Sequence, residues 1–156
     1  MGVPYKGAIY SVCETPQPSD LDQAGFEALT FVAVAGTLTL PESGITDSMV
    51  SQQFVSPGVD QNYKGHKSAG VGVTLELGSL PEDDGQIALK AMAATRFNYA
   101  YKIELADRET GLGTNTFIYN RGVVGGPVNP FGGGEDFHNL TFIFGFNQEP
   151  VTVDRT

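Results

Sequence analysis

Two histidines, one cysteine and a short run of carboxylates are the residues of this sequence whose types could support chemistry. His66 and His138 belong to no H-x₃-H or H-E-x-x-H pattern, and Cys13 is near neither of them. Metal centres draw on such ligands at short, regular spacings. No G-x-S-x-G nucleophile motif occurs. The sequence therefore predicts no metal, no cofactor and no enzyme, although a triad assembled from distant residues stays open.

The carboxylates of "EDDG", Glu82–Asp84, could form an acid–base pair or a cation site. A helix start explains the same residues without chemistry. Ser79 and Glu82 have the S-x-x-E spacing of a capping box, and Pro81 is tolerated in a first helical turn. Negative charge is favoured there by the helix dipole. We therefore interpret this segment as the beginning of a helix, with Ser79 and Glu82 as its capping residues.

Composition and charge limit the classes of function. The 156 residues are 40% hydrophobic, with 20 glycines, 9 prolines and no tryptophan, which predicts a single folded domain over 1–156 with many turns. The net charge of −9 disfavours tight binding to nucleic acid or to anionic membranes. No apolar run approaches the roughly 18 residues of a membrane span, and no secretory signal is recognised. We expect synthesis in the cytoplasm and no membrane partner.

Most apolar residues follow the period of β-strands. Alternation is clear in "VGVTLEL", "YAYKIEL" and "LTFIFGF", and the run from Glu27 to Leu40 is continuously β-prone. Six or seven strands are predicted, with one helix after the third or fourth. The expected fold is mainly β, an antiparallel β-sandwich or partly open barrel flanked by one α-helix.

A long segment without clean periodicity, about 41–66, interrupts the strands. Loops beyond about 12–15 residues in a compact domain tend to be functional or disordered, and the apolar residues scattered through this one argue against disorder. We expect it to contact another subunit, with folding back onto its own domain as the alternative. The residues expected to make these contacts are Ile45, Met49, Phe54, Val55 and Tyr63.

Three short motifs in order carry a resemblance to a known family: "KSAG" at 67–70, "GQIALKA" at 85–91 and "YAYKI" at 99–103. Their order and spacing resemble the tail tube (major tail) proteins of long-tailed, non-contractile, lambda-like bacteriophages. The resemblance covers residues 67–105; the rest agrees only in the order and length of its elements. The chain departs from some members in lacking an additional C-terminal immunoglobulin-like domain and in its own loop at 125–135.

The resemblance implies a β-sandwich with a flanking helix, a fold that it also shares with the type VI secretion tube protein. It implies hexameric rings that stack into the tube of the virion tail, around the tape-measure protein and between tail-tip and terminator proteins. DNA would pass through the lumen without specific binding, which the negative charge favours because repulsion from the wall lets DNA slide. The residues we expect to face the lumen are Thr37, Thr39, Thr74 and Glu76.

Other functions remain open. A tail terminator or distal-tail ring protein would form isolated rings instead of tubes. A monomeric β-sandwich binding module, for carbohydrate for example, would present an aromatic platform, but the chain has no tryptophan and Tyr99 and Tyr101 fall on the inward face. A small hydrolase is the least supported class.

Overall fold

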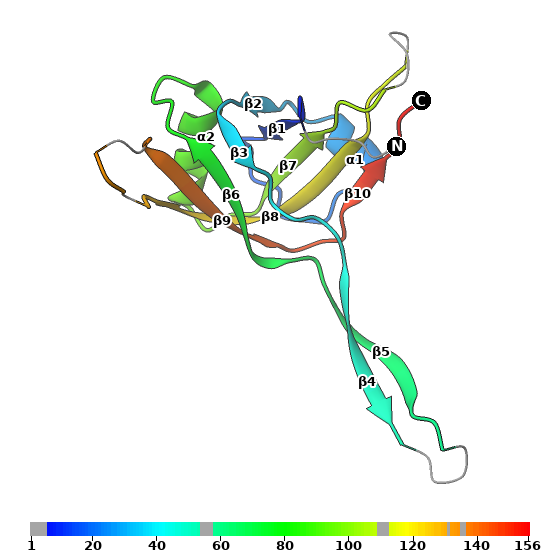
Figure 1. Cartoon of the computed structure of the whole chain (residues 1–156). Helices are drawn as coiled ribbons and strands as arrows, with labels where there is room; N and C mark the ends of the chain where they lie inside the picture. The colour runs from blue at the N-terminus through cyan, green and yellow to red at the C-terminus, as the bar shows by residue number, and fades with distance from the viewer. Residues whose placement is uncertain (1–5, 54–57, 109–112, 131, 135–136) are drawn as a thin grey trace.

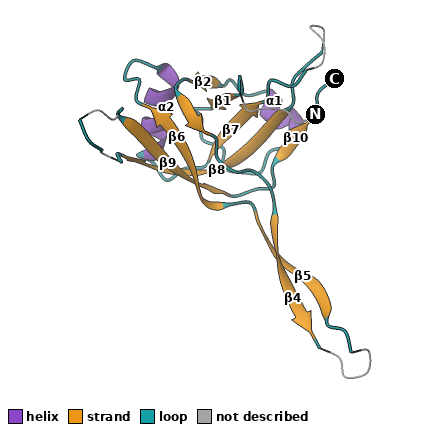
Figure 2. Ribbon diagram, viewed as in Figure 1, coloured by secondary structure: helices purple, strands orange, loops and turns teal. Residues whose placement is uncertain are grey.

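The computed structural model describes residues 6–53, 58–108, 113–130, 132–134 and 137–156. The protein is mainly β and its strand pairs are antiparallel, as predicted (Figures 1 and 2). The elements in chain order are β1 (Ile9–Val12), α1 (Gln23–Glu27), β2 (Val32–Val34), β3 (Thr37–Thr39), β4 (Thr46–Gln52), β5 (Gln61–Ser68), β6 (Val71–Gly78), α2 (Asp84–Ala93), β7 (Tyr99–Glu104), β8 (Phe117–Val128), β9 (Asn139–Phe146) and β10 (Val151–Val153).

Eight strands form one sheet in the order β2-β1-β7-β8-β9-β6-β3, with β10 paired to β8. The end strands of this order, β2 and β3, are separated in sequence by only Ala35 and Gly36. Two residues cannot cross a flat sheet of seven strands, so the sheet must curl until its ends meet. The remaining two strands, β4 and β5, form a hairpin of their own that stands away from this body (Figure 1).

The core lies inside the curl, against α2. It is formed by alternate residues of the long strands: Tyr99, Tyr101 and Ile103 of β7, Leu75 and Leu77 of β6, and Leu140, Phe142, Phe144 and Phe146 of β9. All of these side chains are buried, which confirms the inward faces predicted for β7 and β9. On β6 the apolar alternation extends to Val71, but Val71 is 86% exposed, beyond a register shift between Val71 and Val73. Full burial of one such side chain stabilises the fold by about 1.5–3 kcal/mol. The period-2 pattern of the sequence therefore identifies the core-facing residues of β7 and β9.

A second, smaller cluster covers the opposite face of the sheet. Phe26 of α1 stacks on Tyr119 of β8 with ring centroids 5.1 Å apart, and Cys13 and Ala100 complete the cluster. Helix α1 corrects the expectation of a single helix. A helix of five residues is too short to show an amphipathic period, so the sequence does not distinguish this segment from a loop. The helix begins because the Asp22 carboxylate accepts from the Gly25 N–H at 2.8 Å.

The continuous strand expected over 27–40 is also corrected. The chain breaks at Gly36, which has φ +78°, and β2 and β3 lie on opposite ends of the sheet. A β-carbon at Gly36 would approach the Gly78 carbonyl oxygen to 2.8 Å. The positive φ and this close approach both require glycine. A β-prone composition on both sides of the glycine concealed the break.

Candidate assembly surfaces

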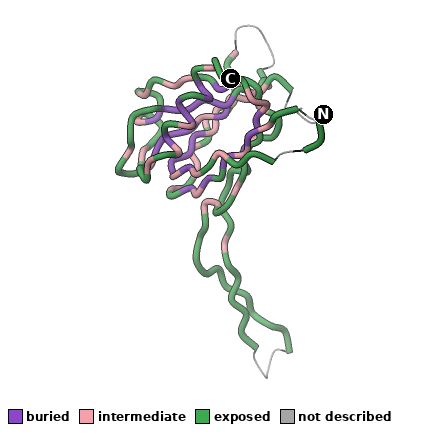
Figure 3. Tube along the Cα trace, turned by 90° about the vertical axis from the view of Figure 1, so that its left-hand side faces the viewer, coloured by how far each residue is buried: buried purple, intermediate pink, exposed green. Residues whose placement is uncertain are grey.

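The β4–β5 hairpin is the most exposed part of the structure (Figure 3). Every residue of β5 is exposed, as is every residue of β4 except Asp47. Three large apolar side chains lie on its two strands: Met49 is 64% exposed, Val50 56% and Tyr63 53%. Val50 is paired with Tyr63, so these two share one face, and Met49 lies on the other. The hairpin therefore exposes apolar side chains on both of its faces.

This hairpin corrects the irregular loop expected over 41–66. Strands embedded in a core reveal themselves by alternating apolar and polar residues. In the described part of the hairpin both faces of the strands are largely exposed, so the strands carry no such alternation and were not recognised. Among the predicted contact residues, Met49 and Tyr63 lie on the hairpin and are exposed. Phe54 and Val55 lie outside the described residues.

Ile45 lies at the root of the hairpin. It lines a hollow of about 300 Å³ together with Ala69 and Phe146. The body end of the hairpin is held by a hydrogen bond from the Phe146 N–H to the Gly70 carbonyl at 3.0 Å and by a Lys67–Glu149 ion pair of 3.0 Å. The hydrogen bond to Glu149 raises the pKa of Lys67. Both side chains of this pair are mostly exposed, so it adds little to stability.

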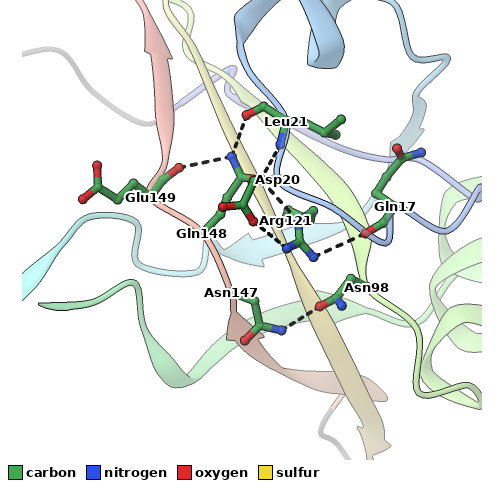
Figure 4. A network of polar contacts seen from close by, with 8 residues as sticks. All are labelled: Gln17, Asp20, Leu21, Asn98, Arg121, Asn147, Gln148 and Glu149. Carbon is green, nitrogen blue, oxygen red and sulfur yellow. Dashed lines mark hydrogen bonds and ion pairs between the residues drawn. The ribbon is translucent and has the colours of Figure 1, made fainter. Parts of the chain in front are cut away.

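A polar network lies beside this root (Figure 4). The Arg121 side chain is only 7% exposed, and its guanidinium donates to Asp20 at 2.7 Å, to the Gln17 carbonyl at 3.3 Å and to Gln148 Oε1 at 3.3 Å. Gln148 also binds both backbone groups of Leu21, accepting from its N–H at 2.9 Å and donating to its carbonyl at 2.8 Å. The network fixes the 17–21 segment against β8 and the chain that leaves β9.

No sequence signal identified this network. Arg121 occurs in a β-prone run where an exposed position is the ordinary expectation for arginine. The members of the network, Arg121 included, come from three segments that are far apart in sequence, so only the folded chain brings them together. Gln148 of this network is followed in sequence by Glu149, which pairs with Lys67 at the hairpin root, so the network lies between the root and the body.

The exposed face of β3, β6 and β9 contains three of the four residues expected to face a lumen. Thr39, Thr74 and Glu76 are exposed, and the Thr39 hydroxyl donates to a Glu76 carboxylate oxygen at 3.4 Å. Thr37 differs, because the register shifts between Thr37 and Thr39 and places Thr37 opposite the buried Leu77. Thr37 is half-buried and bonds back to the Val34 carbonyl at 3.4 Å. The four residues therefore do not form one surface.

The start of α2 corrects the predicted cap. Its N-cap is Asp83, whose carboxylate accepts from the Gln86 N–H at 3.0 Å; Ser79 and Glu82 both precede the helix. A turn closed by the Asp83 N–H and the Leu80 carbonyl at 3.0 Å takes up Pro81, which moves the helix start past the apparent capping box. The acidic run is a helix start, as interpreted, but a different residue caps it.

Gln86 is a fully buried polar residue of the "GQIALKA" motif. Its amide nitrogen donates to the Ala35 and Gly78 carbonyls, both at 2.8 Å, and its amide oxygen accepts from the Leu80 N–H at 3.0 Å. Next to it, a β-carbon on Gly85 would collide with the Ala33 carbonyl oxygen. The glycine lets α2 approach β2 and the glutamine joins the meeting ends of the sheet, so the motif has a structural purpose.

Chemistry-bearing side chains do not gather. Within the described ranges, no group of three or more His, Cys, Asp or Glu is placed to hold a metal ion. His66 is on the exposed hairpin, and His138 contacts Asn129 Oδ1 at 2.9 Å. Cys13 is buried in the smaller cluster. Neither described helix is long and apolar enough to cross a membrane.

Comparison with models of known protein families and with curated proteins gives no match to this chain. The resemblance to tail tube proteins thus rests on the motifs at 67–70, 85–91 and 99–103. The structure shows where these residues lie: Lys67 forms an exposed ion pair at the hairpin root, Gln86 joins the sheet ends, and Tyr99, Tyr101 and Ile103 fill the core.

Proposed function

We propose that the protein is a structural subunit of a bacteriophage tail tube. Six copies form a ring, and rings stack into a conduit of the virion tail. The subunits are made in the cytoplasm of the host bacterium. The partners of each copy are other copies, with the tape-measure protein inside the tube and tail-tip and terminator proteins at its ends. No catalytic residue and no cofactor take part.

The observation that carries this proposal is the protruding hairpin. A two-stranded hairpin is marginally stable by itself in water, and this one leaves Met49, Val50 and Tyr63 uncovered. Side chains of this kind on an arm that leaves its own domain favour contact with a neighbouring molecule. An arm on one side and a different receiving surface on the other make a head-to-tail contact, which closes into rings or continues as a filament.

Charge supports the role as a conduit. Each copy carries a net charge of −9, so a ring of six carries 6 × (−9) = −54. Glu76 lies on the exposed sheet face that we assign to the lumen, with the short polar side chains of Thr39 and Thr74. A channel wall of this composition repels the phosphates of DNA and does not bind its nucleobases, so DNA can slide through without being held.

Negative-stain electron microscopy of the concentrated protein tests the proposal. Long tubes of uniform diameter with an axial channel are the expected result. Isolated rings that never stack would instead identify a tail terminator or distal-tail ring protein. A sharp monomer peak at every concentration, with the hairpin resistant to protease, would overturn the proposal in favour of a monomeric binding module.

A further inference from the structure

A hollow of about 720 Å³ lies between β3 and the neighbouring ends of β7 and β8. One wall is the segment 37–43, which comprises β3 and the chain leading to the hairpin, and the other comes from 6–8 and from the neighbouring ends of β7 and β8. A hydrogen bond of 3.1 Å from the Asn120 amide to the Ser43 hydroxyl joins the walls. We call this hollow the groove.

Apolar side chains line the groove: Leu38, Leu40, Ile103, Leu105 and Ile118. Leu38 is 60% exposed even though it is part of a strand. The two ionisable groups of the lining, Lys6 and Glu42, have opposite charges. Hollows of this size and lining are typical of binding sites, because water gains little from apolar walls. The groove suits an apolar occupant that carries no net charge.

The hairpin of another copy carries no net charge and exposes several apolar side chains. Residues 46–68 contain two acidic and two basic side chains, so the hairpin is neutral and the rest of the chain carries the whole −9. Contact between two bodies would bring like charges together, whereas contact between a hairpin and a body does not. The hairpin also presents Met49, Val50 and Tyr63, which its own body leaves uncovered.

We propose that the groove receives the hairpin of a second copy, with Tyr63 and its neighbours packed against Leu38 and Leu40. The hairpin points away from its own body in both views of the chain (Figures 1 and 3), so the contact is between copies. This inference rests on the proposed function and specifies which surface of the neighbour takes the arm. Because the arm and the groove are different surfaces, every copy can both give and receive.

Cysteine cross-linking tests this contact in the full-length protein, in a Cys13→Ala background. A size-tagged Leu38→Cys variant is mixed with an untagged Tyr63→Cys variant, assembled and oxidised. The expected product is the mixed disulfide dimer. Ile87→Cys replaces Leu38→Cys as the matched control, because Ile87 is comparably exposed, at 51%, on α2. The control should give at least about tenfold less product, which corresponds to the absence of a specific contact.

The outcomes separate the inference from the function on which it rests. Tubes that form while Tyr63→Cys couples equally to Leu38→Cys and Ile87→Cys overturn the groove contact but leave the proposed function standing. A Leu38→Cys/Tyr63→Cys double variant that closes its disulfide within one chain also overturns the contact. Failure of the unsubstituted protein to assemble overturns both. As an independent measure, Leu38→Asp should raise the concentration needed for assembly at least about tenfold, whereas Ile87→Asp should not.

Discussion

The amide nitrogen of Gln86 donates to the Ala35 carbonyl at 2.8 Å and joins α2 to the two-residue link between β2 and β3. The same nitrogen donates to the Gly78 carbonyl at the end of β6. One buried side chain therefore satisfies backbone groups from both ends of the curled sheet. Burying an amide without partners is costly, and the fully buried Gln86 side chain avoids this cost by bonding to backbone groups at the strand ends.

Replacement of this glutamine should be severe. Gln86→Leu keeps the approximate size but leaves the Ala35 and Gly78 carbonyls and the Leu80 N–H without their partner. We expect the free energy of unfolding, measured by chemical denaturation, to fall by about 2–4 kcal/mol. Gln23→Leu on the exposed surface of α1 is the matched control and should change it by less than about 0.5 kcal/mol. Equal effects of both substitutions would refute the assigned role.

The helix cap can be tested by two alanine substitutions. Asp83→Ala removes the oxygen that accepts from the Gln86 and Ala35 N–H groups and should lower the free energy of unfolding by about 1–2 kcal/mol. Ser79→Ala should have a clearly smaller effect, because Ser79 precedes the turn and not the helix. Thermal unfolding followed by circular dichroism measures both. A larger loss for Ser79→Ala would restore the capping box inferred from sequence.

The Arg121 network predicts a further loss of stability. Arg121→Met preserves the aliphatic stem but removes the hydrogen bonds to Asp20, Gln17 and Gln148. Since Asp20 is exposed and can be solvated, we expect a loss of about 1–3 kcal/mol from the lost hydrogen bonds. Arg96→Met, at an exposed position, is the control. Native-state hydrogen exchange should show faster exchange of the Leu21 N–H in Arg121→Met, and unchanged exchange there would contradict the link.

The lumen assignment makes a prediction about DNA. Glu76→Lys changes the charge of each copy by two units on the exposed sheet face, so assembled tubes should retain double-stranded DNA at low salt and release it at high salt. Glu82→Lys makes the same change just before α2, outside that face, and its tubes should retain none. Co-sedimentation of DNA with tubes measures both. Equal retention by the two variants would place Glu76 elsewhere than on the lumen.

The sequence predicted the buried parts of this fold better than the rest. Alternation along Tyr99–Ile103 and Leu140–Phe146 identified the inward faces, because one-sided burial imposes a period of two. The exposed strands of the hairpin show no such alternation, so the sequence predicted a loop there. Buried polar residues were missed for the opposite reason. Gln86 and Arg121 resemble surface residues until partners from distant segments surround them.

Removal of the hairpin tests the central claim most directly. Thr46 and Ser68 are paired, so an Asn-Gly turn can replace residues 47–67 without disturbing the eight-stranded sheet, with which the hairpin shares no strand pairing. Thermal unfolding first checks that the shortened and the unsubstituted protein melt at the same temperature. Sedimentation of the two concentrated proteins is then compared. We predict that the unsubstituted protein pellets as tubes while the shortened protein stays monomeric. A shortened protein that pellets as tubes, or an unsubstituted protein that stays monomeric, would contradict assembly through the hairpin.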